Sequence, residues 1–241
     1  MIAFLAVLAA GCGSASSTST STSKSTSRTA ANRASSRPDP NAIPTGSVAV
    51  VLGTPITETA LNHWMYVAAK SQAAQSPGQA VIVPDPPAYK SCVAQGRKKV
   101  PDLKKASTKT LLANCRQIFL TLSSQAMDFL IKADWIQADG ARHGIVPTAA
   151  QVAGVYTKAK QQQFPGGKGY EAFLAETGQT DQDVRFRFRI TFIFGRLTAR
   201  EKGTTDARQT AVENREKRLF TGQTRCAMLV LMADCGNYRK G

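Results

Sequence analysis

A proline-free stretch from Thr108 to His143 places the strongest constraint on the fold. Its apolar residues recur every three or four positions, which puts their side chains on one face of an α-helix. They are Leu111, Leu112, Cys115, Phe119, Leu122, Ala126, Phe129, Leu130, Ala133 and Ile136. Gly144 is a natural residue to end a helix, and Arg142 and His143 complement the negative end of its dipole. The sequence therefore predicts one long helix over residues 108–143.

Shorter helical patterns lie on both sides of this stretch. Thr57 is the expected N-cap of a helix that carries Leu61, Trp64 and Met65 on its apolar stripe. Other helices are expected around Cys92, from Thr148, over residues 169–178 and over residues 206–220. The segment "VRFRFRI" (184–190) alternates like a strand, but the flanking Thr180 and Asp183 form a variant of the capping box and favour a helix.

Strands are expected to be few and short. Residues 48–52, "VAVVL", are rich in β-branched side chains and predict one strand. The tail "CAMLVLMADC" (226–235) is a second candidate, closed by its own disulfide. The predicted fold class is mainly α, a helical core with one or two short β-strands and a long tethering tail.

The first residues predict export and an anchor. Residues 2–10, "IAFLAVLAA", are apolar but cover only about half of the ~20 residues that a membrane-spanning helix needs. They are typical of the apolar part of a secretion signal, and because no Lys or Arg precedes them we expect the true start to lie upstream of Met1. Small residues precede Cys12, and a Ser/Thr-rich segment (13–47) too poor in apolar groups to fold follows it. This layout is that of a bacterial lipoprotein, which predicts lipid on Cys12 and an extracytoplasmic chain anchored to the cell membrane.

The remaining four cysteines suggest disulfides, since an exported chain with an even number of cysteines usually pairs them. Cys92, Cys115, Cys226 and Cys235 allow three connectivities, of which the sequence-local pairs Cys92–Cys115 and Cys226–Cys235 are favoured because each brackets its own segment. No two cysteines have the close spacing of a zinc site. Neither a metal nor a cofactor is therefore expected.

No catalytic motif stands out in the sequence, and no catalytic residue is assigned. His63 lies beside Trp64, where a packing role is the simpler interpretation, and His143 has the helix-end role described above. Four phenylalanines, at positions 186, 188, 192 and 194, form the one unusual cluster. They are interpreted first as core between helices; the alternative is that some of them line an apolar groove for extended polypeptide, with Arg185, Arg187 and Arg189 nearby.

The chain is strongly basic. Its formal net charge is +15, and about +12 of this lies beyond residue 47, so the folded part itself attracts anionic partners. Charge alone does not choose among anionic lipid, acidic polypeptide and other acidic polymers. Nucleic acid is not expected as a partner, because an exported lipoprotein rarely meets it.

Two stretches resemble the SurA/PrsA-type foldases, extracytoplasmic chaperones that often carry a parvulin peptidyl-prolyl isomerase domain. The first is "VAVVLGTPITETALNHWMYVAAKS" (48–71), where Gly53, Ile56, Thr57 and Trp64 match the family's strand, turn and capped helix. Leu52 departs from the usual asparagine before the glycine, and leucine tolerates the positive φ of a tight turn poorly. The second lies in residues 125–197, whose "HGIVPTAAQ" and "YEAFLAETGQT" resemble the family's Gly-Ile, Thr-capped helix and following helices.

The resemblance implies a chaperone with a SurA-N-terminal-like helical core that shields unfolded, newly secreted polypeptides. With the N-terminal pattern and the cysteine positions, the resemblance leads us to expect a signal peptide and lipobox (1–12), a tether (13–47), a helical core (48–225) with a disulfide-stapled insertion (76–115), and a disulfide-closed tail (226–241). Isomerase activity is the alternative, although no parvulin domain of ~50 residues or more fits after the core. A basic envelope scaffold that binds anionic surfaces is a further alternative.

Overall fold

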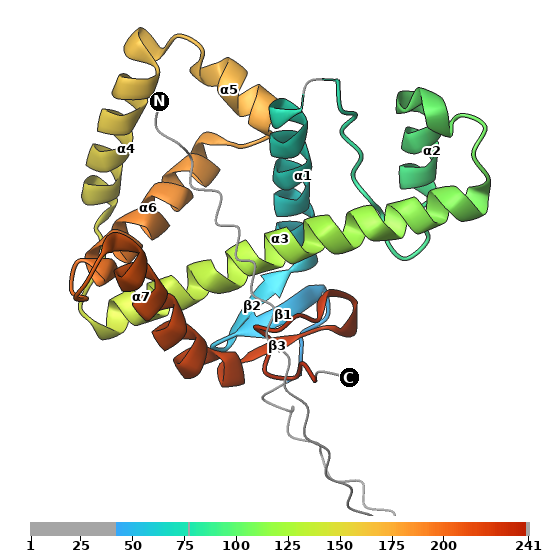
Figure 1. Cartoon of the computed structure of the whole chain (residues 1–241). Helices are drawn as coiled ribbons and strands as arrows, with labels where there is room; N and C mark the ends of the chain where they lie inside the picture. The colour runs from blue at the N-terminus through green and yellow to red at the C-terminus, as the bar shows by residue number, and fades with distance from the viewer. Residues whose placement is uncertain (1–41, 77, 240–241) are drawn as a thin grey trace, which may run out of the picture. The chain divides into compact units, whose positions relative to one another are not determined.

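Helix α3 (Thr108–Arg142) is the longest element of the computed structural model, which describes residues 42–76 and 78–239 (Figure 1). At 1.5 Å per residue it is about 52 Å long. The side chain of Ser107 caps its first turn by accepting a hydrogen bond from the Thr110 amide, and Gly144 follows its end with a φ of +69°. The predicted helix over 108–143 is confirmed. Cys12, the signal segment and residues 13–41 of the tether lie outside the described residues.

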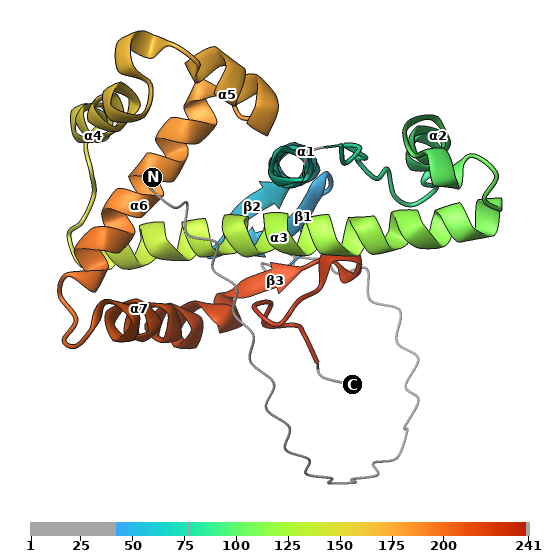
Figure 2. The same ribbon diagram turned by 45° about the horizontal axis from the view of Figure 1, so that its top comes forward.

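Four of the other helices pack along α3. Helix α2 (Lys90–Lys99) lies near its N-terminal end, α1 (Glu58–Gln75) against its middle, and α6 (Asp181–Thr198) and α7 (Thr205–Phe220) toward its C-terminal end (Figures 1 and 2). Helix α4 (Ala149–Gln163) packs on α6, and α5 (Tyr170–Thr177) on α1. The fold is mainly helical, as predicted.

The helix caps also agree with the sequence. Thr57, Thr148 and Thr180 each accept a hydrogen bond from a backbone amide in the first turn of α1, α4 and α6 respectively. At α6, the Asp183 carboxylate in turn accepts from the Thr180 amide and completes the capping box. The alternation in residues 184–190 therefore belongs to a helix.

A small antiparallel sheet in the order β2–β1–β3 packs against α3 and lies below it in the view of Figure 1. Its strands are β1 (Ser47–Val51), β2 (Thr54–Thr57) and β3 (Thr224–Cys226), one more than the one or two predicted. Val51 pairs with Thr54, so Leu52 and Gly53 form a two-residue turn with φ values of +53° and +83°. Leu52 thus adopts the left-handed conformation that leucine disfavours, and its side chain packs against the core instead of extending into solvent.

The C-terminal segment differs from the expectation. A strand over residues 226–235 is wrong: β3 ends at Cys226, and Met228–Val230 form a single 3-10 turn. Strand β3 pairs with β1 and crosses the boundary drawn at residue 226 between core and tail. Thr224 is fully buried, accepts a hydrogen bond from the Trp135 indole N–H at 3.0 Å and donates one to the Phe220 carbonyl, so side-chain contacts join β3, α3 and α7.

Helices α3 and α6 cross at Gly140, where a glycine is required. A Cβ atom at this position would lie 2.4 Å from Cγ2 of Ile193 on α6 and 3.0 Å from the Ile145 carbonyl oxygen. The close approach buries Ile193, Leu197 and Val212 in a second hydrophobic cluster between α3, α6 and α7. In the described residues no helix has the length and apolar character that crossing a membrane would demand.

A buried carboxyl group gives the fold a pH dependence. Glu216 on α7 is 2% exposed; burial, together with the charge of Asp139, raises the pKa of its carboxyl from 4.5 to about 8. Between these two pH values the folded chain holds a proton that the unfolded chain releases, so stability falls as the pH rises from about 4.5 to about 8.

Replacing Glu216 with glutamine should remove this dependence. We expect the melting temperature of Glu216→Gln to exceed that of the wild type by several degrees at about pH 8 and to differ much less at about pH 5. Thermal unfolding followed by circular dichroism at both pH values tests this. An equal difference at the two pH values would contradict the assignment of the pH effect to Glu216.

Candidate functional site

The four phenylalanines of α6 do not form one surface. Each is half-buried, and they divide among separate clusters. Phe186 packs beside Trp64 and Phe129 in the main core, Phe188 lies 6.0 Å from the Tyr156 ring, and Phe194 packs against the second hydrophobic cluster. Phe192 lies under the Arg196 guanidinium, 5.3 Å away. Because successive helical residues point about 100° apart, the four phenylalanine rings lie on different sides of α6. In the structure each ring packs against neighbouring side chains.

The two histidines and Arg187 also have structural partners, whereas Arg189 is exposed. His63 lies 2.9 Å from Asp183, the carboxylate that caps α6, and His143 lies 3.5 Å from Asp139 at the end of α3. The Arg187 guanidinium lies 5.0 Å from the Trp64 ring and 4.9 Å from the Phe129 ring. Burial lowers the pKa of Arg187, against the opposing effect of Asp183. The contacts of His63 and Arg187 position α6 against α1 and α3.

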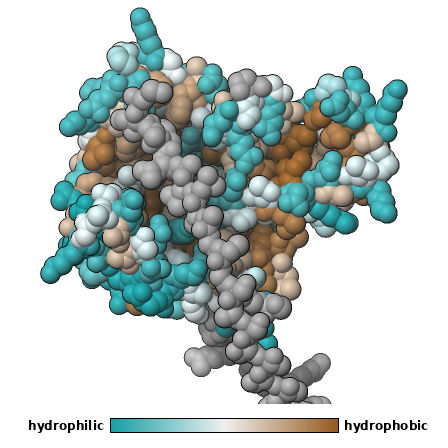
Figure 3. All heavy atoms as spheres, viewed as in Figure 1, coloured by the Kyte–Doolittle hydropathy of each residue, from teal (hydrophilic) through white to brown (hydrophobic). Residues whose placement is uncertain are grey.

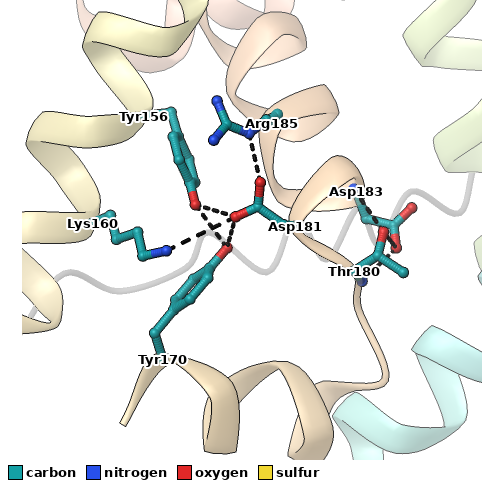
Figure 4. A network of polar contacts seen from close by, with 7 residues as sticks. All are labelled: Tyr156, Lys160, Tyr170, Thr180, Asp181, Asp183 and Arg185. Carbon is teal, nitrogen blue, oxygen red and sulfur yellow. Dashed lines mark hydrogen bonds and ion pairs between the residues drawn. The ribbon is translucent and has the colours of Figure 1, made fainter. Parts of the chain in front are cut away.

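A polar network joins α4, α5 and α6 (Figure 4). Tyr156 and Tyr170 both donate hydrogen bonds to one oxygen of Asp181, the latter at 2.9 Å, and Arg185 donates to the other oxygen at 2.6 Å. Lys160 lies 3.6 Å from the centre of the Tyr170 ring and 3.9 Å from Asp181.

The network suits a structural role better than a catalytic one. Burial would raise the pKa of Asp181, but the hydrogen bonds from Tyr156, Arg185 and Tyr170 outweigh it and lower the pKa to about 2. Burial and the hydrogen bonds that Tyr170 makes with Tyr156 and Asp181 raise the pKa of Tyr170. Asp181 is therefore a poor proton acceptor and Tyr170 a poor proton donor at neutral pH. The contacts hold three helices together.

An open groove lies elsewhere, between the end of α1, the segment 78–82, the end of α2 and the N-terminal half of α3. Its volume is about 560 Å³. Its apolar lining consists of Ala69, Ala80, Ile82, Val100, Pro101, Leu103, Ile118 and Leu122, and its polar lining is mostly amide side chains, from Gln72, Gln79, Asn114 and Gln117. Figure 3 shows apolar side chains gathered in the area between α1 and α2. This groove is the candidate functional site.

The disulfide Cys92–Cys115 fixes one wall of the groove by joining α2 to α3. The Asp85 carboxylate accepts hydrogen bonds from the amides of Ser91 and Cys92, at 2.9 and 2.8 Å, and so caps α2. Lys99 at the other end of α2 donates to the Val81 carbonyl at 2.8 Å. Helix α2 and the segment before it are thus held on α3, with the groove between them and α1.

The groove was not predicted from the sequence. The sequence feature that could have indicated it is the apolar run "AVIV" (80–83). In the structure this run lies outside any helix or strand and is half-buried. The two disulfides, Cys92–Cys115 and Cys226–Cys235, are the sequence-local pairs favoured from the sequence. The first belongs to the candidate site and the second closes the segment after β3.

Across residues 42–76 and 78–239, no three His, Cys, Asp or Glu side chains come together as a metal site requires. Comparisons of this chain with protein-family models, with curated proteins and with solved structures found no match.

Proposed function

We propose that this protein is a membrane-tethered extracytoplasmic chaperone that binds unfolded, newly secreted polypeptides without ATP. The observation that carries the proposal is the open groove of about 560 Å³ with an apolar lining on α1, α2 and α3. The resemblance of residues 48–71 and 125–197 to the SurA/PrsA-type foldases points in the same direction.

The lining suits transient binding of an extended chain. Each CH₂ group that leaves water contributes ~0.8 kcal/mol, so the few apolar side chains that fit in the groove give weak, reversible binding. Gln72, Gln79, Asn114 and Gln117 carry amide groups that both donate and accept hydrogen bonds. They offer partners to the unpaired backbone N–H and C=O groups of an extended segment.

The tether forms the second part of the proposal. The tether expected over 13–47 overlaps the folded part by one residue, because β1 begins at Ser47. A lipid on Cys12 would hold the folded part close to the membrane surface. Secreted polypeptides pass through this region as they emerge. Labelled lipid should be incorporated into the wild type, and a Cys12→Ser variant that still takes up the label would exclude this attachment.

The groove is tested by suppression of aggregation. The full chain, added in excess to a chemically unfolded model protein without ATP, should reduce light scattering. The double variant Ile82→Ser/Ile118→Gln removes two apolar side chains from the lining. It should raise the concentration needed for half-suppression about tenfold, because ~1.4 kcal/mol of lost binding is a factor of ten.

The matched control is Leu120→Gln/Leu229→Ser. Both leucines are more than half exposed and neither lines the groove, although Leu120 lies on α3 two residues from Ile118. This variant should suppress aggregation like the wild type. If the wild type leaves scattering unchanged, the chaperone proposal fails; if both double variants lose activity equally, the groove is not its site.

A further inference from the structure

One wall of the groove belongs to a strongly basic segment, of whose charged side chains Lys99 lines the groove itself. The segment "RKKVPDLKK" (97–105) contributes Lys99, Val100, Pro101 and Leu103 to the lining, so apolar contact and charge come from the same nine residues. Its basic side chains are Arg97, Lys98, Lys99, Lys104 and Lys105, and all are exposed. Asp102 is its only acid, and no acidic residue lines the groove.

These five charges are not neutralised within the described part of the chain, where none of them forms an ion pair with a carboxylate. Arg97 and Lys99 donate instead to neutral groups, the Thr108 hydroxyl at 3.0 Å and the Val81 carbonyl at 2.8 Å. Five basic residues elsewhere in the described chain do contact a carboxylate, namely Lys132, Lys160, Arg185, Arg215 and Lys217, whereas this segment gathers five that do not within nine positions. The wall therefore presents a net positive charge beside an apolar surface.

The lining favours a polypeptide over a lipid as the occupant. A lipid chain makes no hydrogen bonds, whereas four amide side chains line this groove. The backbone N–H groups of Ala80, Val81, Ile82 and Val83 along its edge donate to no backbone carbonyl among the described residues. Backbone N–H groups without a backbone partner and amide side chains beside an apolar surface suit an extended chain, which carries N–H and C=O groups of its own.

We infer that the groove selects extended polypeptide segments whose apolar residues are flanked by Asp or Glu. The inference rests on the proposed function and adds to it a class of substrate. Apolar side chains enter the groove, and the flanking carboxylates meet the basic wall. Exposed charges mainly affect the association rate and the choice among partners. The basic side chains should therefore determine which peptides are preferred, and the apolar lining should supply much of the affinity.

Three labelled peptides test the selectivity. They share one apolar centre and carry Glu, Ser or Lys in both flanks, and their binding to the full chain is followed by fluorescence anisotropy. At low salt the Glu-flanked peptide should bind about tenfold more tightly than the Ser-flanked one, and the Lys-flanked peptide more weakly than either. The difference should shrink at about 0.5 M salt, where charges are screened within a few ångströms.

Two triple variants separate local from overall charge. Lys98→Glu/Lys104→Glu/Lys105→Glu reverses three charges of the basic segment next to lining residues, and Lys158→Glu/Lys202→Glu/Arg218→Glu makes the same change in net charge at exposed positions in parts of the chain that contribute no lining residue. The first should abolish the preference for Glu flanks while leaving Ser-flanked binding within about twofold, which also reports that the variant is folded. The second should keep the preference.

Three outcomes would overturn the inference. The first is that the wild type binds the Glu- and Ser-flanked peptides equally. The second is that both triple variants lose the preference to the same extent. The third is that the wall variant loses binding to phosphatidylglycerol vesicles but keeps the peptide preference. In each case the proposed function would still be supported if suppression of aggregation depends on Ile82 and Ile118. If no peptide binds and aggregation is also unchanged, the proposed function fails as well.

Discussion

Replacing Arg215 with methionine is expected to lower the free energy of unfolding by about 3–5 kcal/mol. Arg215 on α7 donates two hydrogen bonds to one oxygen of Asp139, at 2.8 and 3.0 Å, and a third to Glu201. Asp139 is completely buried in α3. Without the guanidinium its carboxylate would remain in the interior beside the buried carboxyl of Glu216, and an unpaired buried charge is strongly destabilising.

Arg218→Met is the matched control for this prediction. Arg218 lies one turn further along α7, is exposed and forms no ion pair within the described residues, so its loss should change the free energy by less than about 0.5 kcal/mol. Asp139→Asn, introduced together with Arg215→Met, should recover part of the lost stability because it removes the unpaired charge. Urea unfolding of the four proteins measures these effects. Equal losses for Arg215→Met and Arg218→Met would show that the buried pair does not hold α7 on α3.

The helices could be predicted because their signals are local. The three-and-four spacing in residues 108–142 depends only on neighbours within two turns, and a cap such as Thr148 depends on residues three positions away. Residues 184–190 show the value of these signals. Their alternation favoured a strand, but the capping box at Thr180 and Asp183 marked the start of a helix.

The contacts that complete the fold could not be predicted, because they join residues far apart in the sequence. Strand β3 exists because Thr224–Cys226 can pair with β1, more than 170 residues earlier. Asp139 and Arg215 are separated by 76 residues, and no spacing rule links them. The tight turn at Leu52 opposes the local preference of leucine and forms where Leu52 packs on the core and its amide donates to the Gln223 carbonyl.

The candidate site shows the same limit. The sequence drew attention to the phenylalanines of α6 because they are close together along the chain, yet helical geometry separates their side chains. The groove is instead assembled from four segments between residues 69 and 122, none of which is unusual alone. Only the predicted disulfide Cys92–Cys115 indicated, from the sequence, that the segment of α2 lies beside α3.

Removing that disulfide with Cys92→Ala/Cys115→Ala is expected to lower the free energy of unfolding by about 3.5 kcal/mol. The estimate follows from the entropy that a crosslink over 23 positions removes from the unfolded chain. For Cys226→Ala/Cys235→Ala, whose crosslink spans nine positions, the same relation gives about 2.7 kcal/mol. Both cysteine pairs are buried, so alanine replaces them with little change in exposed surface. Urea unfolding of the two double variants and the wild type measures the difference.

The two disulfides should differ more in function than in stability. Cys92–Cys115 holds α2, whose last residues begin the basic segment, on α3. Cys226–Cys235 lies in the segment after β3 and lines no part of the groove. Under conditions where both variants remain folded, Cys92→Ala/Cys115→Ala should therefore lose suppression of aggregation and preference for acidic peptides, while Cys226→Ala/Cys235→Ala keeps both. If the two variants lose activity in proportion to their stability alone, the position of α2 does not determine binding. A selective loss would instead show that the crosslink maintains the groove, because a general loss of stability acts on both variants alike.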